Sequence, residues 1–476
     1  QFTPYRLGAL LTPPVKGGEW EWEREADPEK EKTMLASKQL LKRQLGGIIA
    51  NKKDQGHVTD GLKDELAGLE SYDDLAALGE KLRDLPLKDN WPYNEPSDLE
   101  GIWAEADPDR PKGPIADVDL DNAAQRVESA FLGAVAGCIL GKPLEINPTL
   151  EEIRTAAEKV GEWPINDYIT VDLMEAIGRK HGSWQHTTRG NINCVVPDDD
   201  LNYTTLGMMV LEQYGIGFTK EDVRSLWMEN LPIRYVFGPE RYQLIKAGLH
   251  FTCADGMEEL DNWTEIWNPG DELCGAQIRA DAYGYACPGR PDLAAEFAWR
   301  DSSWTHRRTG IYATMFTSAA IACALVMDDR LAPFETALKF VPQKSRFYEI
   351  TEDCLNMVKE ASDWMEGYEA INKKYGEFRH CQVYQETASL MNSMKFAENV
   401  GHGICIQVSQ GMDTDCFGEI IGSLLGAFFG PGHLEDRWLE PFNDIFHTSL
   451  GSFYEQSLSA VAKRMGGLPK LVCDQL

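Results

Sequence analysis

The apolar positions of this chain recur mostly with the period of an α-helix. In residues 411–429 they form a stripe at i, i+3, i+4, i+7, i+8 and i+11, the spacing of one buried helix face. The stripe consists of Phe417, Ile420, Ile421, Leu424, Leu425 and Phe428. The alternation of apolar and polar positions that marks a strand is scarce along the chain. We therefore predict an all-α fold.

The amino-acid composition of the chain changes near residue 117. Residues 29–88 are rich in Lys, Glu and Leu with helical spacing, and we expect two or three amphipathic helices with solvated charges there. The Pro-rich stretch that follows, "NWPYNEPSDLEGIWAEADPDRPKGP", is typical of a connector. From residue 117 onward the segments become long, small and apolar. We predict an N-terminal helical extension with a connector over residues 1–116, and a larger domain over residues 117–476.

Glycines recur at every fourth position in two of the apolar segments. They stand at positions 133, 137 and 141 in one segment and at positions 418, 422 and 426 in the other. A spacing of four places each set on one face of a helix, where a second backbone can approach closely because there is no Cβ atom. We expect these two helices to pack against each other.

The composition is that of a globular protein with a strong acidic excess. Apolar residues make up 43% and charged residues 26% of the 476 positions, and the formal net charge is -30. This charge disfavours nucleic acid, which attracts basic surfaces, and anionic membrane surfaces. An anionic substrate would need a cation or helix N-termini close to it. We also find no apolar segment that reaches the ~18 residues of a membrane span.

The eleven cysteines are scattered and include no CxxC pair. An odd number without framework spacing fits buried thiols in a reducing compartment better than a disulfide scaffold. The N-terminal residues lack the hydrophobic stretch of a signal peptide. We therefore expect a cytoplasmic protein.

Asp413 and Asp415 stand directly before the C-terminal apolar stripe, in "GMDTDCFG". They could form a helix cap, a calcium loop or half of a metal site. The calcium loop fails because Phe417 and Leu424 occupy two of its ligand positions. The helix cap remains open, since an aspartate at a helix start satisfies free backbone N–H groups.

Residues 117–128 come closer to a calcium loop, with acidic residues at loop positions one, three, five and twelve. However, Asn122 replaces the glycine of the turn, and the preceding stretch is Pro-rich rather than helical. We expect Asp121 to cap the following helix instead.

A second acidic cluster, Asp198 to Asp200, also precedes a predicted helix. Three adjacent aspartates repel one another, and either a solvated helix start or a bound cation relieves that repulsion. Mg²⁺ selects carboxylate and water oxygens, and two acidic helix starts that face each other suit a two-metal site. Glu145 in "GCILGKPLE" is either a surface residue or a third carboxylate, aimed into the same cleft for acid–base chemistry or metal binding.

The ordered set of these segments resembles the ADP-ribosylglycohydrolase family. The set comprises the glycine-rich helix that ends near Glu145, the "PDDD" segment and the C-terminal "GMDTDCFG". Residues 275–316 also look like the central part of that family, and the resemblance spans about residues 120–450. It implies an all-α globule whose central cleft holds two Mg²⁺ ions, or occasionally Mn²⁺. It also implies that residues 117–476 form the catalytic domain.

The resemblance gives roles to individual residues, because the family's T-D-D-T and D-x-D-[ST] motifs fall on residues 197–200 and 413–416. The implied metal ligands are Asp198, Asp199, Asp413, Asp415 and Cys416. The candidate catalytic residues are Glu145 and Asp199, and Glu145 occupies a position that touches metal or the reacting water in some members. The candidate substrate contacts are Asp200, Gly275, Arg279 and Gly411.

The chain departs from the family pattern at several of these positions. Pro197 replaces a threonine that supplies a hydroxyl ligand, and Cys416 replaces the second hydroxyl with a thiol, which is a poor partner for Mg²⁺. Cys138 stands where an aspartate is usual, and Phe417 where a small or polar residue is common. Asp200 could supply one of the lost oxygens.

Other candidate residues have simple structural explanations. We expect His306 to be a buried, hydrogen-bonded histidine that at most contacts the residues of the site without touching the substrate. Arg279 could pair with Asp281 instead of contacting a phosphate or a sugar. Tyr283 and Trp304 could stack on a base, although core packing explains them better.

The predicted activity is Mg²⁺-dependent hydrolysis of a glycosidic bond at an anomeric carbon, with release of ADP-ribose or a ribosyl group. The substrate would be a small molecule or an ADP-ribosylated side chain, with no nucleic acid or membrane as partner. Two alternatives stay open. One is a glycosidase or nucleosidase for a small substrate without ADP-ribose, and the other is a non-catalytic relative that serves as a structural or binding module.

Overall fold

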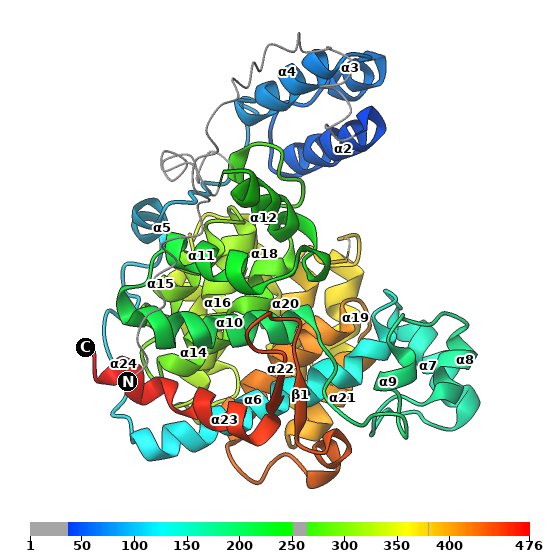
Figure 1. Cartoon of the computed structure of the whole chain (residues 1–476), viewed down its shortest axis with the longest axis vertical. Helices are drawn as coiled ribbons and strands as arrows, with labels where there is room; N and C mark the ends of the chain where they lie inside the picture. Colours follow the sequence, from blue (N-terminus) through cyan, green and yellow to red (C-terminus); the bar gives the residue numbers. More distant parts are fainter. Residues whose placement is uncertain (1–36, 251–263, 379) are drawn as a thin grey trace, which may run out of the picture.

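The computed structural model describes residues 37–250, 264–378 and 380–476, and it consists almost wholly of helices (Figure 1). The first helices are α2 (Lys38–Asp54), α3 (Leu62–Gly68), α4 (Tyr72–Arg83) and α5 (Leu99–Glu105). The main body begins with α6 (Leu120–Gly141), the 3-10 helix η2 (Lys142–Leu144), α7 (Leu150–Val160), α8 (Val171–Ile177), α9 (Trp184–Thr187), α10 (Asp199–Tyr214), η3 (Gly215–Gly217), α11 (Lys220–Asn230), η4 (Ile233–Tyr235) and α12 (Gly238–His250).

The main body continues with η6 (Cys274–Arg279), α14 (Asp281–Ala286), α15 (Pro291–Ser302), α16 (Thr309–Ala324), α17 (Ala332–Ala337), η7 (Leu338–Phe340), α18 (Arg346–Glu360), α19 (Trp364–Tyr375), α20 (Tyr384–Phe396), α21 (Val400–Ser409) and α22 (Thr414–Phe429). It ends with η8 (Asp436–Trp438), η9 (Glu440–Phe442), α23 (Leu458–Gly466) and α24 (Leu468–Cys473). Within the described ranges the only strands are β1 (Ile445–His447) and β2 (Glu455–Ser457), which pair antiparallel. The predicted all-α fold is confirmed.

Helices α2, α3 and α4 form a group at one end of the molecule (Figure 1). They bury a hydrophobic cluster of their own, consisting of Leu45, Ile48, Ile49, Leu62, Leu66, Leu75, Leu78 and Leu82. The hydroxyl groups of Ser37 and Ser71 cap α2 and α4 by accepting a backbone N–H bond from the first turn. Trp267 of the main body packs against this cluster. These are the amphipathic helices expected in residues 29–88, of which residues 29–36 lie outside the described part of the chain.

The main body is organised around the helix pair α6 and α22. A Cβ atom added to Gly137 would lie 1.9 Å from the carbonyl oxygen of Gly418, and one added to Gly422 would lie 2.1 Å from that of Gly133. The two backbones can therefore touch only because these positions are glycine. The contacts run in opposite directions along the two helices, so the end of α6 meets the start of α22. The predicted packing of the two glycine-rich helices is confirmed.

Buried helices surround this pair. Helices α16, α20 and α21 pack against α22, and α23 packs against α6. Every residue of α16 is buried, and its composition of mostly small residues lets neighbouring helices approach closely. The helix pair is thus fixed from several directions, which fixes the position of the residues at its end.

The α6 helix differs from two sequence expectations. Its cap is Asp119, whose carboxylate accepts the N–H of Asp121 at 3.0 Å, whereas Asp121 itself lies in the first turn. By length and composition the stretch Leu120–Leu144 could also cross a membrane, contrary to our expectation that no segment is long and apolar enough. However, 83% of its most apolar 18 residues are buried inside the protein, as in a core helix.

Candidate active site

Two helices begin with aspartates at the same place in the fold. Asp198 is the N-cap of α10, and its carboxylate accepts a backbone N–H bond from the first turn. Asp413 occupies the same position before α22, with Asp415 in the first turn of that helix. The end of α6 joins them, because Thr414 Oγ1 donates a hydrogen bond to the carbonyl oxygen of Gly141 at 2.8 Å. The fold thus collects both acidic clusters at one end of the α6–α22 pair.

Lys142, the first residue after α6, connects the two clusters through its ammonium group. Its Nζ atom lies 2.5 Å from Glu145 Oε2, 2.7 Å from Asp198 Oδ2 and 2.7 Å from Asp415 Oδ2. The contact with Asp415 is also a hydrogen bond, whereas those with Glu145 and Asp198 are ion pairs. Burial alone would lower the pKa of Lys142, but the three carboxylates raise it well above the ordinary value. The sequence prediction did not include Lys142, whose only local signal is its spacing of three from Glu145.

Burial weakens both predicted catalytic acids. Burial, followed by the charge of Asp415, raises the pKa of Glu145 to about 9 even with Lys142 beside it. Burial, followed by the charge of Asp198, raises the pKa of Asp199 to about 8. For Asp415, by contrast, Lys142 and neighbouring hydrogen bonds outweigh burial and lower the pKa. One ammonium group therefore does not compensate all the carboxylates gathered here.

Some carboxylate oxygens of this cluster are buried without a donor. Among the described residues, none donates a hydrogen bond to either oxygen of Asp200 or to Oδ1 of Asp415. Ligand atoms of Asp200, Asp415 and Cys416 lie within 4.8 Å of one another, and so do those of Asp200, Asp198 and Cys138. Buried acceptors of this kind require either a proton or a cation.

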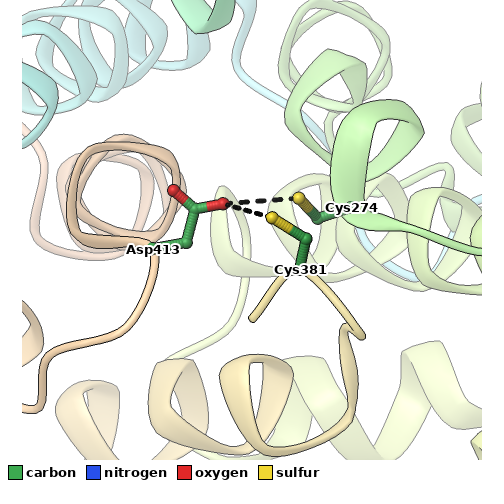
Figure 2. A group of neighbouring side chains, drawn as sticks. All are labelled: Cys274, Cys381 and Asp413. Carbon is green, nitrogen blue, oxygen red and sulfur yellow. Dashed lines mark hydrogen bonds between the residues drawn. The ribbon is translucent and has the colours of Figure 1, made fainter. Parts of the chain in front are cut away.

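Thiol groups that the sequence did not predict lie beside Asp413. Cys274 is the first residue of η6, Cys381 lies in the segment before α20, and both side chains point toward Asp413 (Figure 2). Their Sγ atoms lie 3.4 and 3.3 Å from Asp413 Oδ2. The two cysteines are far apart in the sequence and belong to no CxxC pair, so no local pattern could have identified them.

A cavity of about 240 Å³ is lined by residues of both groups. Its lining includes Glu145, Asp199, Asp413, Cys416 and Gly275, together with both cysteines of Figure 2. Asp198, Asp200 and Asp415 are buried within the protein close to this lining. A concave site with several converging polar groups is the expected place for a ligand, and the predicted catalytic acids Glu145 and Asp199 both reach it.

Only some of the predicted substrate contacts line the cavity. Gly275 lines the cavity, whereas Asp200 is fully buried. Gly411 has a φ of +81°, and a Cβ atom there would lie 2.4 Å from the carbonyl oxygen of Pro148. Glycine at position 411 therefore has a structural reason, because both its backbone conformation and its surroundings exclude a side chain.

Arg279 is fully buried and uses all of its N–H groups inside the protein. Its partners are Asp301, Glu240, Gly275 and Thr305, with 2.6 Å to Asp301 Oδ1 and 2.8 Å to Glu240 Oε1. The expected alternative partner, Asp281, instead accepts a hydrogen bond from Tyr285 at 3.1 Å. This placement favours a structural role for Arg279 over the predicted contact with a substrate.

The remaining candidates also lie in the core. His306 is fully buried, and its Nδ1 atom lies 2.8 Å from Thr305 Oγ1. The hydroxyl of Tyr283 donates to Asp301 Oδ2 at 2.6 Å, and Trp304 packs edge-on against Trp227. Core packing explains these side chains, as predicted from the sequence.

These donors do not fit a pair of magnesium ions. Mg²⁺ binds oxygen ligands and keeps several of its waters, but the ammonium group of Lys142 already lies among Glu145, Asp198 and Asp415. Asp413, on the other side, faces thiols, which are poor ligands for Mg²⁺. The cluster still requires positive charge, yet the predicted di-magnesium centre is not what this donor set favours.

Comparison with known proteins finds one family over most of the chain. The family model described as ADP-ribosylglycohydrolase matches residues 119–469. A solved structure described as "ADP-ribosylglycohydrolase-related protein complex" is similar at 18% identity and a TM-score of 0.46, over 73% of this chain and 99% of that chain. No curated protein matches the chain. The matched range includes both glycine-rich helices, both acidic clusters and the thiols beside Asp413.

Proposed function

This chain belongs to the ADP-ribosylglycohydrolase family, and from that premise we propose that it hydrolyses a glycosidic bond at an anomeric carbon and releases ADP-ribose or a ribosyl group. The observation that carries the proposal is the cavity that Glu145 and Asp199 both line. One acid follows α6 and the other opens α10, so the fold brings together two carboxyl groups that are distant in the sequence.

Hydrolysis of a glycosidic bond needs a group that activates water and a group that assists the leaving atom or the sugar. The side chain of Glu145 is 33% exposed, and Lys142 holds one of its oxygens. Because the pKa of Glu145 is raised to about 9, we assign Glu145 to orienting the attacking water, and Asp199, whose raised pKa keeps its proton available, to the sugar hydroxyls or the leaving group.

Lys142 is a positioning residue in this proposal. Its three ammonium contacts go to carboxylates, so it holds Glu145, Asp198 and Asp415 in a fixed arrangement. No step passes through the predicted Mg²⁺ or Mn²⁺ ions, because the donor set does not fit a pair of them. The predicted dependence on Mg²⁺ stays a prediction, and the assay below measures it.

The test is turnover of a substrate panel by the full-length chain. The panel contains ADP-ribosyl-arginine, ADP-ribosyl-serine, α-ribosides and simple glycosides, each with Mg²⁺, with Mn²⁺, with Zn²⁺ and with chelator. We expect hydrolysis of at least one ribosyl substrate. Glu145→Gln and Asp199→Asn are each expected to lower kcat by about 100-fold or more, as for the loss of a general acid or base.

The matched control is Glu158→Gln on α7, whose side chain is 51% exposed and pairs with Arg154 on the surface. It should retain the activity of the unmodified chain. If the unmodified chain turns over no member of the panel under any metal condition, the proposal is wrong.

A second candidate is hydrolysis of a small riboside or nucleoside without ADP-ribose. The volume of the cavity, about 240 Å³, favours this candidate because ordinary ligand pockets begin at ~300 Å³. Turnover of a nucleoside or a plain riboside without turnover of either ADP-ribosyl amino acid would select it.

The proposed setting is the cytoplasm, with a small molecule or an ADP-ribosylated side chain as substrate. Each cysteine that the structure describes is a free thiol, which supports a reducing compartment. The net charge of -30 argues against nucleic acid as a partner.

A further inference from the structure

Three side chains from distant parts of the chain converge at one point of the cavity wall (Figure 2). We call Cys274, Cys381 and Asp413 the thiol cluster. One sulfur or oxygen atom from each of them lies within 4.8 Å of the other two. All three residues line the cavity, so an ion that enters the cavity can reach them.

The separations within the thiol cluster match those between ligands of one tetrahedral metal ion. The Sγ atoms of Cys274 and Cys381 lie 3.4 and 3.3 Å from Asp413 Oδ2. In a tetrahedral zinc site, with Zn–S of ~2.3 Å and Zn–O of ~2.0 Å, neighbouring sulfur and oxygen ligands lie about 3.5 Å apart. Two weak S–H···O bonds to the two lone pairs of this oxygen account for the contacts while the thiols keep their protons, and the same convergence of two sulfur atoms and one oxygen is what a shared cation requires once the thiols lose them.

His380 lies close enough to the thiol cluster to supply a fourth ligand. His380 lines the same cavity, and its Nε2 atom lies 4.0 Å from Asp413 Oδ2. Its Nδ1 atom lies 3.7 Å from Glu386 Oε1, and a carboxylate near the second ring nitrogen is the usual companion of a metal-binding histidine. The side chain of His380 is 33% exposed, so the ring has room to turn toward the ion.

The backbone around the thiol cluster is held in an unusual conformation. Cys381, Val383 and Met412 have φ angles of +65°, +47° and +67°, which are unfavourable for residues that carry a Cβ atom. The N–H of Cys274 donates to the carbonyl oxygen of Cys381 at 3.0 Å, which joins the two cysteine-bearing segments directly. Such conformations persist where the surrounding structure imposes them, and they are frequent at ligand sites.

We propose that the thiol cluster, with His380 as the fourth donor, binds one thiophilic divalent cation, for which Zn²⁺ is the best match. Thiolate and imidazole ligands favour Zn²⁺ over Mg²⁺, and four such ligands suit its tetrahedral geometry. Lys142 and a thiophilic ion would then supply the positive charge for which the sequence predicted two Mg²⁺ ions. This inference concerns which ion the chain binds, and it holds whether or not the proposed hydrolysis occurs.

The experiment is metal analysis of the full-length chain, purified under reducing conditions without added metal and after removal of the affinity tag. We expect elemental mass spectrometry to find about one zinc ion per chain. After chelation and refilling with Co²⁺, sulfur-to-cobalt charge-transfer absorption should appear. Cys274→Ser and Cys381→Ser should each lose this absorption in part and bind zinc at least ~100-fold more weakly in competition with a chromophoric chelator.

The matched controls are Cys287→Ser, at a buried cysteine elsewhere in the core, and Cys473→Ser, at an exposed one. Both should keep the ion and the absorption. Circular dichroism shows whether each variant folds, and alkylation of the unmodified chain supplies a test without mutation. In that test the bound ion should protect Cys274 and Cys381 from alkylation, and chelator should remove the protection.

Three outcomes would overturn the inference. They are Mg²⁺ bound in preference to Zn²⁺, a disulfide between Cys274 and Cys381 in the reduced preparation, and alkylation of both thiols at the same rate with and without chelator. A failure of the proposed hydrolysis would leave the metal content unchanged, so the two proposals can fail separately.

Discussion

At the scale of single residues, Lys142 places an ammonium group where the family resemblance implies a metal ion. Its Nζ atom lies within 2.7 Å of three carboxylates, and its exposed fraction is 7%. A lysine in this position carries its charge permanently, whereas a metal ion has to be bound from solution. We therefore expect the arrangement of Glu145, Asp198 and Asp415 to form without a divalent metal ion at this point.

The substitution Lys142→Ala tests whether the ammonium group takes the place of a metal ion. It leaves three carboxylates without their cation, and breaking a buried ion pair costs about 3–5 kcal/mol of unfolding free energy. It also opens a space lined by carboxylate oxygens, which a hydrated Mg²⁺ ion prefers. We expect millimolar Mg²⁺ to raise the unfolding temperature of Lys142→Ala much more than that of the unmodified chain.

The control for this substitution is Lys180→Ala, which removes a lysine that pairs with Glu175 near the surface. It should show a small loss of stability and the same response to Mg²⁺ as the unmodified chain. If Mg²⁺ raises the unfolding temperature of Lys142→Ala by no more than that of the unmodified chain, Lys142 does not stand in for a metal ion.

Asp271 gives a second residue-scale prediction, which concerns pH. Burial raises its pKa to about 6 although Arg308 lies close to it, and the charged groups around it are Arg308, Glu272, Lys52 and Glu265. An unfolded aspartate titrates near pH ~3.9. Between about pH 4 and pH 6 the folded chain keeps this proton and the unfolded chain has lost it, so the contribution of Asp271 to stability falls as pH rises through that window.

The substitution Asp271→Asn removes this titration while it keeps the shape of the side chain. Urea unfolding of both proteins across the pH range should show the stability of the unmodified chain falling relative to that of Asp271→Asn from about pH 4 to pH 6, with a constant difference above pH 6. Parallel stability curves through this window would show that Asp271 does not titrate there.

At the scale of elements, the glycine faces of α6 and α22 set the position of the site. The substitution Gly137→Ala would place a Cβ atom 1.9 Å from the carbonyl oxygen of Gly418, so the helices would have to move apart. Overpacking of a core costs about 1–3 kcal/mol and sometimes more. We expect a loss at the upper end of this range, or failure to fold, because backbone atoms lie on both sides of the contact.

The matched control is Gly46→Ala in α2, where the nearest neighbouring atom would lie 3.8 Å from the new Cβ atom. Alanine has the higher helix propensity, so this substitution should leave stability unchanged or raise it by up to ~1 kcal/mol. Thermal unfolding of both variants measures the difference. Equal effects at the two positions would mean that α6 and α22 can separate without loss.

The elements could be predicted from the sequence because their determinants are local. The apolar stripe lies within the single helix α22, and the aspartates of each acidic cluster stand at the N-cap and first residues of α10 or α22. The cap of α6 was predicted two residues too late, at Asp121 instead of Asp119, because several aspartates in a row offer equivalent caps.

The contacts that define the chemistry of the site could not be predicted in the same way. Lys142 meets Asp415 across a separation of 273 residues, and Cys274 meets Asp413 across 139. A lysine after a helix and isolated cysteines carry no periodic or spacing signal that distinguishes them from surface and core residues. Their roles follow from the packing of α6 against α22, which the sequence predicts, and from the path of the segments around η6 and α20, which it does not.

At the scale of the whole molecule, the N-terminal extension helps to form a second cavity of about 620 Å³. From the extension and its connector, Asn51, Asp54, Trp91 and Tyr93 line this cavity, and from the main body Glu272, Leu273, Arg346, Phe378 and Tyr384 do so. Leu273 also lines the smaller cavity that Glu145 and Asp199 line, so the two cavities adjoin. We propose that the described part of the N-terminal extension, residues 37–116, completes the substrate site of the domain formed by residues 117–476.

Trp91 is the residue through which this proposal can be tested. If the substrate carries ADP-ribose, its ribosyl end fits the smaller cavity, and its base can stack on an aromatic ring of the larger one. Stacking of a base on an aromatic side chain contributes ~1–3 kcal/mol, so Trp91→Ala should lower kcat/KM for an ADP-ribosyl substrate by roughly 10- to 100-fold. A small riboside does not reach Trp91, and its kcat/KM should stay unchanged.

The control is Trp103→Ala in α5, a tryptophan of the same extension that packs on Phe340. Any general loosening of the extension would affect both variants and both substrates alike. Selective loss with the ADP-ribosyl substrate in Trp91→Ala alone would therefore locate the nucleotide end in the larger cavity. A loss of equal size for both substrates would assign Trp91 to folding, and no loss with either would place the rest of the substrate elsewhere, because a ring that contributes binding energy cannot be removed without a change in kcat/KM.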